Sequence, residues 1–104
     1  MHLQATQTVD LLDRKNRRLG LVTIERVEDD FVLGSFEPSP EFAAVEPLFS
    51  ELVEAANEQL FHRVDDLDSA IAQLGLHLGT ANGAPLPAIS DVQIADGNIS
   101  FRRG

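Results

Sequence analysis

The C-terminal part of the chain carries the pattern that most constrains the fold. Two runs of alternating residues, 89–95 and 98–103, flank the dipeptide Asp96-Gly97. This dipeptide is a strong signal for a two-residue hairpin turn, whose central residues adopt positive φ angles. The resulting cross-strand pairs are Ile94–Ile99, Val92–Phe101, Gln93–Ser100 and Asp91–Arg102. Apolar residues share one face of this hairpin, so the chain needs a sheet whose apolar face is covered by a second layer.

Three strands are predicted before the first helix, at residues 8–13, 21–27 and 31–36. A tight turn at Lys15-Asn16 joins the first two, because Asn tolerates a left-handed backbone. A three-residue loop at 28–30 joins the second and third, because it keeps apolar residues opposite one another. The predicted pairs are Val9–Val22, Asp13–Arg18, Val22–Phe36, Val27–Phe31 and Ile24–Gly34. Gly34 has no side chain, which would let a helix approach the sheet.

After these strands, apolar residues recur at spacings of three and four, which is typical of an amphipathic helix. These residues are Phe42, Val45, Phe49, Leu52, Val53, Ala56 and Leu60. Pro47 interrupts the pattern because it removes one backbone donor. Either one helix over 40–61 is kinked, or a short turn at 40–45 precedes a main helix at 46–61.

A second helix is predicted to follow Asp65 and Asp66, whose carboxylates would cap its first amide groups and complement its dipole. Its apolar stripe consists of Leu67, Ala70, Ile71 and Leu74. Gly75 is expected to end this helix. Residues 76–78 could then form a short strand before a loop at 79–87.

The order of these elements predicts a single α+β domain over residues 1–104. The expected architecture is a two-layer sandwich, in which a mainly antiparallel sheet of about five strands is covered on one face by two helices. The large apolar residues at inward positions are expected to form the core, and they are Phe36, Phe49, Leu52, Ile94 and Phe101.

Charge and cysteine content narrow the classes of function. The chain has 17 acidic and 8 basic residues, a formal net charge of −9, and no cysteine. A strongly acidic surface repels nucleic-acid phosphates and anionic membranes, so neither is an expected partner. Without cysteine the chain has no disulfide and no thiolate metal site. The N-terminal residues lack the pattern of a signal peptide, so we expect a cytoplasmic protein.

Half of the basic residues lie together in the first predicted hairpin, and they are Arg14, Lys15, Arg17 and Arg18. This cluster could contact a phosphate, a nucleic acid or an acidic partner. Alternatively, it is a solvated turn whose charges balance the acidic body and pair with Asp13. No aromatic residue interleaves the cluster, so stacking on nucleic-acid bases is not supported.

Side chains suited to catalysis or metal binding are few. The one compact group is His62, Asp65, Asp66 and Asp68. These acids lie across a predicted helix start, where capping explains them without a metal. His77 is expected on the polar face of a short strand rather than as a catalytic base. Because the chain also has no nucleophile-elbow motif and no phosphate-binding glycine loop, we expect no catalytic residue, no metal and no cofactor.

Two surfaces are candidates for contact with other molecules. Between Glu28 and Asp68 the chain has twelve acids and one base, and the exposed face of the first helix is lined by Glu51, Glu54 and Glu58. The outer face of the sheet carries Leu12, Leu21, Val27, Phe31 and Leu33. Two sheets could bury this face in a twofold homodimer centred on Leu21 and Leu33, or other segments of the same chain could cover it.

These observations predict a small acidic domain that acts as a non-catalytic protein-interaction or accessory module, with itself or another protein as partner. One alternative is a small-molecule-binding protein or enzyme with a pocket between the helices and the sheet. Another is contact with phosphate or nucleic acid through residues 14–18. The candidate interaction residues are Arg14, Lys15, Arg17, Arg18, Leu21, Leu33, Glu51, Glu54 and Glu58.

Overall fold

The computed structural model describes residues 6–80, 83 and 86–103, so part of the predicted loop at 79–87 lies outside the described residues. In chain order the elements are β1 (Thr8–Leu12), β2 (Arg18–Glu28), β3 (Phe31–Pro38), the 3₁₀ helix η1 (Pro40–Ala44), α1 (Glu46–Asn57), α2 (Phe61–Ala72), β4 (His77–Gly79), β5 (Ile89–Ala95) and β6 (Asn98–Arg103). The predicted order of three strands, two helices, a short strand and a final hairpin is confirmed.

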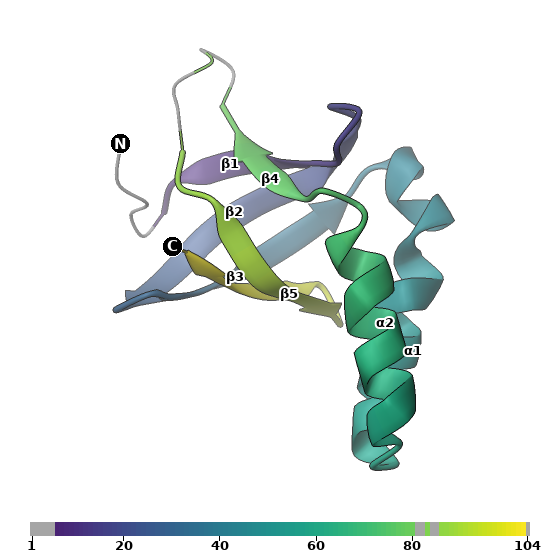
Figure 1. Ribbon diagram of the computed structural model, residues 1–104. Helices are drawn as coiled ribbons and strands as arrows, with labels where there is room; N and C mark the ends of the chain where they lie inside the picture. The colour runs from purple at the N-terminus through teal and green to yellow at the C-terminus, as the bar shows by residue number, and fades with distance from the viewer. Residues whose placement is uncertain (1–5, 81–82, 84–85, 104) are drawn as a thin grey trace.

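The strands form one antiparallel sheet in the order β4-β1-β2-β3-β6-β5. The sheet curls, so that its edge strands β4 and β5 lie toward the viewer in Figure 1 and β2 and β3 lie behind them. Helices α1 and α2 pack against each other and against β5, and η1 packs against β2. This arrangement confirms the predicted α+β sandwich, with six strands where about five were expected.

The first hairpin confirms the predicted pairing of Val9 with Val22. A bulge before Leu12 then shifts the register and places Leu12 opposite Arg18. A bulge adds one residue to one strand of a pair, which displaces every later partner. The predicted pairing of Asp13 with Arg18 is therefore wrong.

The second hairpin confirms the pairs Val22–Phe36 and Ile24–Gly34. The predicted three-residue loop at 28–30 is wrong, because Glu28 lies opposite Phe31 and the turn contains only Asp29 and Asp30. Asp29 has a φ of 54°, as this tight turn requires. The extra residue is instead Glu25, which lies in a bulge of β2.

Gly34 makes room for the neighbouring strand β2 and not for a helix. A Cβ atom at this position would clash with the carbonyl oxygen of Thr23 on β2. The backbones of β2 and β3 approach each other closely here, beside the bulge, and only glycine leaves the space. The prediction that Gly34 makes room for a helix is therefore wrong.

The C-terminal hairpin confirms the pairs Ile94–Ile99 and Gln93–Ser100. A bulge near the start of β5 places Ser90 opposite Arg102, so the predicted register partner Asp91 is wrong. Asp91 and Val92 together lie opposite Phe101 in this bulge. Asp91 has a φ of 52° and still reaches Arg102, with 3.5 Å between its Oδ2 and the Nε of the arginine.

Of the two arrangements considered for residues 40–61, the structure has the short turn followed by a separate helix. Pro47 lies in the first turn of α1 and does not kink a longer helix. α1 ends earlier than predicted, because Gln59 adopts a φ of 58° and the chain reverses there. α2 consequently begins at Phe61, so Asp65 and Asp66 lie within the helix. The prediction that these two carboxylates cap its start is wrong.

The buried face of α1 also differs from the predicted stripe. Val53, Ala56 and Leu60 are exposed, whereas Ala55 is buried. The predicted stripe assumed one α-helical spacing across residues 42–60. The 3₁₀ segment has three residues per turn, so the side chains of the following helix point in other directions than that spacing predicts. The stripe of α1 therefore consists of Phe49, Leu52 and Ala55.

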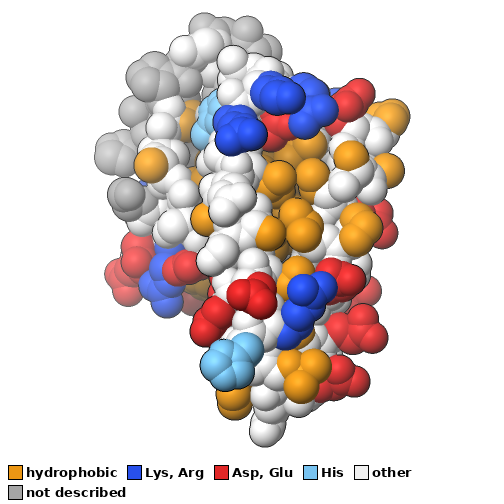
Figure 2. Space-filling model, turned by 45° about the vertical axis from the view of Figure 1, so that its right-hand side comes forward, with side chains coloured by type: hydrophobic (Ala, Val, Ile, Leu, Met, Phe, Trp, Pro, Cys, Tyr) orange, Lys and Arg blue, Asp and Glu red, His pale blue; other side chains and the backbone are white. Residues whose placement is uncertain are grey.

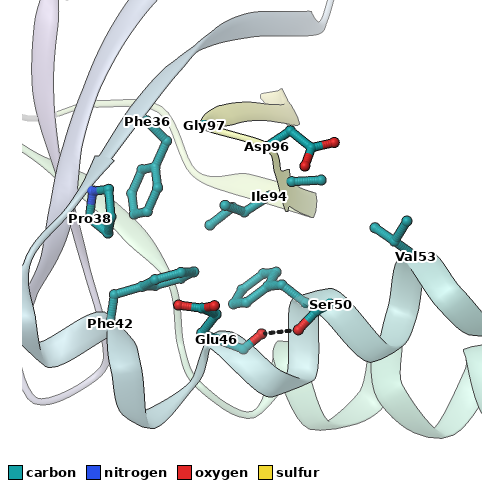
Figure 3. Close-up of a pocket in the computed structure, with 11 residues that line it drawn as sticks. Phe36, Pro38, Phe42, Glu46, Ser50, Val53, Ile94, Asp96 and Gly97 are labelled. Carbon is teal, nitrogen blue, oxygen red and sulfur yellow. Dashed lines mark hydrogen bonds between the residues drawn. The ribbon is translucent and has the colours of Figure 1, made fainter.

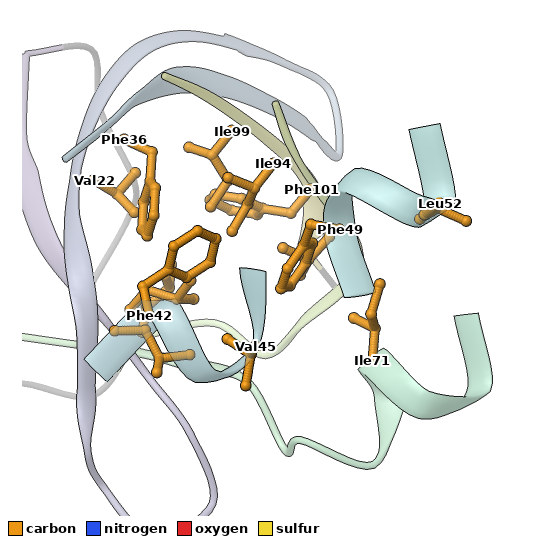
Figure 4. Packing of buried hydrophobic residues seen from close by; sticks show 14 of the residues in the cluster. Val22, Phe36, Phe42, Val45, Phe49, Leu52, Ile71, Ile94, Ile99 and Phe101 are labelled. Atoms are coloured by element: carbon orange, nitrogen blue, oxygen red, sulfur yellow. The ribbon is translucent and has the colours of Figure 1, made fainter. Parts of the chain in front are cut away.

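The core lies between the concave face of the sheet and the helices (Figure 4). All five predicted core residues are buried: Phe36, Phe49, Leu52, Ile94 and Phe101. The ring centroids of Phe36 and Phe42 lie 5.0 Å apart in an edge-to-face arrangement. Phe42 also contacts Phe49, with centroids 5.7 Å apart. These rings join β3, η1 and α1, and such aromatic pairs add to the stability gained from burial.

Candidate functional site

The four cations of the first hairpin do not form a free basic patch. Arg17 Nε lies 2.8 Å from Asp13 Oδ2, and Arg18 Nε lies 2.8 Å from Asp10 Oδ1. Arg14 and Lys15 have no ion pair within the part of the chain that the structure describes. Two of the four positive charges are therefore not paired with a carboxylate and are available to another molecule.

Asp13 is the organising residue of this hairpin. Its side chain is buried, and its carboxylate accepts hydrogen bonds from the backbone N–H groups of Lys15 (2.9 Å) and Arg17 (3.0 Å). The guanidinium of Arg17 donates a third bond of 2.8 Å. Burial alone would raise the pKa of Asp13, but the hydrogen bonds and the charge of Arg17 outweigh it and lower that pKa below its ordinary value.

The basic hairpin is fixed to the end of α2. The backbone N–H of Arg14 donates to the carbonyl oxygen of Leu74 at 2.9 Å. A Cβ at Gly75 would lie 2.6 Å from the Cβ of Arg14, so glycine is needed for this approach as well as for its φ of +65°. The ring nitrogens of His77 lie 3.0 Å from the Gly75 oxygen and 3.0 Å from Asn16 Oδ1. These contacts give the hairpin and His77 a structural role.

The acidic surface is concentrated on the helical hairpin formed by α1 and α2. Between Glu46 and Ala72 the chain has seven acids and one base. The predicted interaction residues Glu51, Glu54 and Glu58 are all exposed. Arg63, the one base, donates to Glu51 at 2.9 Å and links the two helices. Asp and Glu side chains are prominent around the lower part of the molecule in Figure 2.

The tip of this helical hairpin carries exposed apolar residues. Leu60 is 50% exposed and Phe61 is 69% exposed, and among the described residues only Val53 joins them as a large exposed hydrophobic side chain. Phe61 is not among the interaction residues predicted from the sequence. It belongs to neither predicted apolar stripe, and that mismatch was the available signal for an unburied aromatic side chain. An isolated exposed apolar residue is ordinary, whereas Leu60 and Phe61 form two adjacent exposed apolar side chains at the turn between the helices.

The outer face of the sheet is less open than its sequence suggests. Four of the five predicted residues lie on this face and are half-buried: Leu12, Phe31 and the predicted interface residues Leu21 and Leu33. The fifth prediction is wrong, because Val27 pairs with the buried Val32 and packs against the core after the bulge at Glu25 has reversed the alternation of β2. Arg102 lies over the ring of Phe31 at 5.9 Å from the centroid. Less apolar surface is therefore left for a second sheet to bury. The homodimer through this face stays a prediction.

The predicted group around α2 does not assemble into a metal site. Within the described part of the chain, no three His, Asp or Glu side chains converge on a point that could hold a metal ion. Asp68 instead faces Asp91 across a groove of about 430 Å³ between α2 and β5. Partial burial and the charges of Asp91 and Asp65 raise the pKa of Asp68 above its ordinary value.

A cavity of about 380 Å³ lies where α1, η1, β3 and the turn of the last hairpin meet (Figure 3). Phe36, Phe42 and Phe49 contribute apolar surface, and Glu46 and Asp96 contribute carboxylates. His62 and His77 do not line it. Its volume lies within the range of small-molecule binding pockets, which is roughly 300–1,000 Å³.

Comparison of the chain with models of protein families, with curated proteins and with solved structures finds no match. Within the described residues, neither helix has the length and apolar character needed to cross a bilayer. The surface chemistry above is therefore the basis for assigning a function.

Proposed function

We propose that this protein is a non-catalytic interaction module that binds a basic partner protein through the tip of its α1–α2 hairpin. The observation that carries the proposal is the exposure of Leu60 and Phe61 on a projecting turn surrounded by acids. Aromatic side chains that enter a pocket of a partner often supply much of the binding free energy of an interface. Burial of a Phe or Leu side chain contributes about 1.5–3 kcal/mol relative to exposure.

The charge around this tip selects the kind of partner. The acids of α1 and α2 outnumber the single base, which already pairs with Glu51. A surface of this sign accelerates association with a basic protein and disfavours acidic ones. We therefore expect a partner with Lys and Arg residues around an apolar pocket, and an affinity that falls as salt concentration rises.

The other partners considered have less support. Self-association through the basic hairpin is weakened because Arg17 and Arg18 are paired with aspartates of their own chain. The same pairing reduces the charge available for phosphate or nucleic acid. A homodimer through the outer face of the sheet would bury side chains that are already half-buried.

Site-specific photo-crosslinking tests this proposal in the cells that produce the protein. A crosslinking amino acid replaces Phe61 in one variant and Gln73, which is exposed at the other end of α2, in a matched control. We expect an adduct with one basic protein at position 61 and not at position 73, and the purified partner should bind the unmodified domain less tightly at high salt. No adduct at position 61, the same adduct at both positions, or binding insensitive to salt would contradict the proposal.

A further inference from the structure

The cavity beside α1 is built by separate elements that hold it in shape. Phe36 comes from β3, Phe42 from η1, and Phe49 and Glu46 from α1. The backbone N–H of Phe36 donates to the carbonyl oxygen of Gly97 at 2.8 Å, which fixes the turn of the last hairpin over this side of the sheet. The cavity is therefore preorganised by packing and hydrogen bonding.

The floor and wall of the cavity are apolar. The three phenylalanine rings lie in contact, with centroid separations of 5.0 Å and 5.7 Å. The rings are only 2–5% exposed and close the bottom of the cavity, so most of the apolar surface open to a ligand belongs to Pro38, Val53 and Ala95. Aromatic rings also attract a cation that lies near their faces.

The charged side chains that line the cavity are all acidic. Glu46 and Asp96 both line the cavity, and no Lys, Arg or His does. Neither carboxylate forms an ion pair within the described residues. In Figure 3 the Glu46 carboxylate lies beside the Phe42 ring and Asp96 lies at the rim. The hydroxyl of Ser50 donates to the Glu46 carbonyl oxygen at 3.1 Å, which leaves its own oxygen free to accept a bond from a ligand.

We propose that this cavity binds a small organic cation with a flat apolar body, such as an arylalkylamine. The apolar body would lie against Pro38, Val53 and the accessible edges of the phenylalanine rings, and the ammonium group would bond to Glu46 and approach Asp96. A ligand with a carboxylate in place of the ammonium would meet two like charges and be excluded. The site is separate from Leu60 and Phe61, so it stands or falls independently of the interaction surface.

A titration followed by amide NMR with three related probes tests the ligand class. Phenethylamine carries the cation, 2-phenylethanol is its neutral counterpart, and 3-phenylpropionate has the opposite charge. We expect saturable shifts at Ile94, Ala95 and Gly97 with phenethylamine and a Kd on the order of 1–10 mM, the range for a fragment of this size. The alcohol should bind several-fold more weakly, and the carboxylate should not bind. Equal binding of all three, or no binding of the amine, would overturn the proposal.

Two variants of equal net charge assign the site. Glu46→Gln removes the carboxylate in the cavity, and the control Glu41→Gln removes an exposed carboxylate of η1 that does not line it. We expect Glu46→Gln to weaken phenethylamine binding roughly fivefold or more and Glu41→Gln to leave it within twofold, because a specific ion pair outweighs general charge. Asp96→Asn, which keeps a residue suited to the φ of 52° at that position, should also weaken binding. Equal effects of Glu46→Gln and Glu41→Gln would contradict the assignment.

Discussion

Asp13 is the buried charged residue of the described chain, and it shows what sequence patterns miss at the scale of single residues. The sequence predicted that Asp13, which follows β1, would pair with a basic residue of the turn, and Arg17 confirms this, although the predicted strand register had selected Arg18. It could not select Arg17 over Arg18, because adjacent arginines carry the same charge and the bulge before Leu12 is set by backbone geometry.

We expect Asp13→Ala to lower the free energy of unfolding by about 1–3 kcal/mol, because the backbone N–H groups of Lys15 and Arg17 would lose a buried partner. Urea denaturation measures this loss. Asp10→Ala is the matched control, since its exposed pair with Arg18 contributes less than about 1 kcal/mol. Equal losses in the two variants would contradict the role given to Asp13.

The lowered pKa of Asp13 also predicts a dependence on pH. The folded state holds the ionised form more tightly, so its contribution is complete above the ordinary pKa of about 3.9 and disappears as the pH falls through the lower folded pKa. Urea midpoints between pH 5 and 2 should therefore fall more steeply for the wild type than for Asp13→Asn. Parallel curves would show that Asp13 contributes nothing to acid sensitivity.

The pKa of Asp68 is shifted in the opposite direction to that of Asp13. Its raised pKa means that its charged form is disfavoured in the folded state. Asp68→Asn should raise the melting temperature at pH 7, and the advantage should shrink as acidification protonates Asp68 in the wild type. Circular dichroism melts measure this, with Asp66→Asn as a control on the same helix. A lower melting temperature for Asp68→Asn at pH 7 would refute the prediction.

At the scale of elements, alternation and spacing predicted which segments are strands and helices, but not where each begins. The spacing of Phe49 and Leu52 was enough to identify their buried face. The helix boundaries depend on Gln59, a residue type that gives no turn signal, and on its φ of 58°. The bulges could not be predicted for a similar reason. Glu25 and Asp91 are residue types found in ordinary strands or turns, and only the pairing with the neighbouring strand places them in a bulge.

Phe49→Ala tests how α1 is attached to the sheet. Phe49 is 2% exposed, so we expect this substitution to cost about 3–5 kcal/mol through lost burial and the cavity left behind. Val53→Ala on the same helix is the control, and its exposed side chain predicts a loss below about 1 kcal/mol. Similar chemical-denaturation midpoints for the two variants would mean that the buried face of α1 is wrongly assigned.

At the scale of the whole molecule, the layers followed from the sequence and the strand order did not. β4 pairs with β1, and β6 with β3, across long stretches of chain that no turn motif links. The candidate site likewise has one part that could be predicted from the sequence and one part that could not. Composition predicted an acidic helical surface, whereas the exposed tip at Leu60 and Phe61 depends on the position of the turn between the helices. The cavity beside α1 depends on α1, η1, β3 and the last hairpin meeting in space.

The mass of the isolated protein separates the two kinds of protein contact. The homodimer predicted from the sequence and the proposed tip contact differ in the expected mass: because the proposed partner of the tip is a different, basic protein, that proposal predicts a monomer of 11.4 kDa in sedimentation equilibrium at high concentration. A dimer that becomes a monomer when Leu21 and Leu33 are both changed to lysine would show that the sheet face is the interface. That result would contradict assignment of the main contact surface to the helical tip.

The affinity of the crosslinked partner for variants of the tip tests the central claim most directly. Isothermal titration calorimetry would compare the wild type with Phe61→Ala and with Gln73→Ala, both of which change an exposed residue of the α2 region. We predict that Phe61→Ala raises the Kd at least about tenfold, as expected for an aromatic anchor, while Gln73→Ala changes it less than about twofold. An unchanged Kd for Phe61→Ala, with the fold intact by circular dichroism, would contradict the claim.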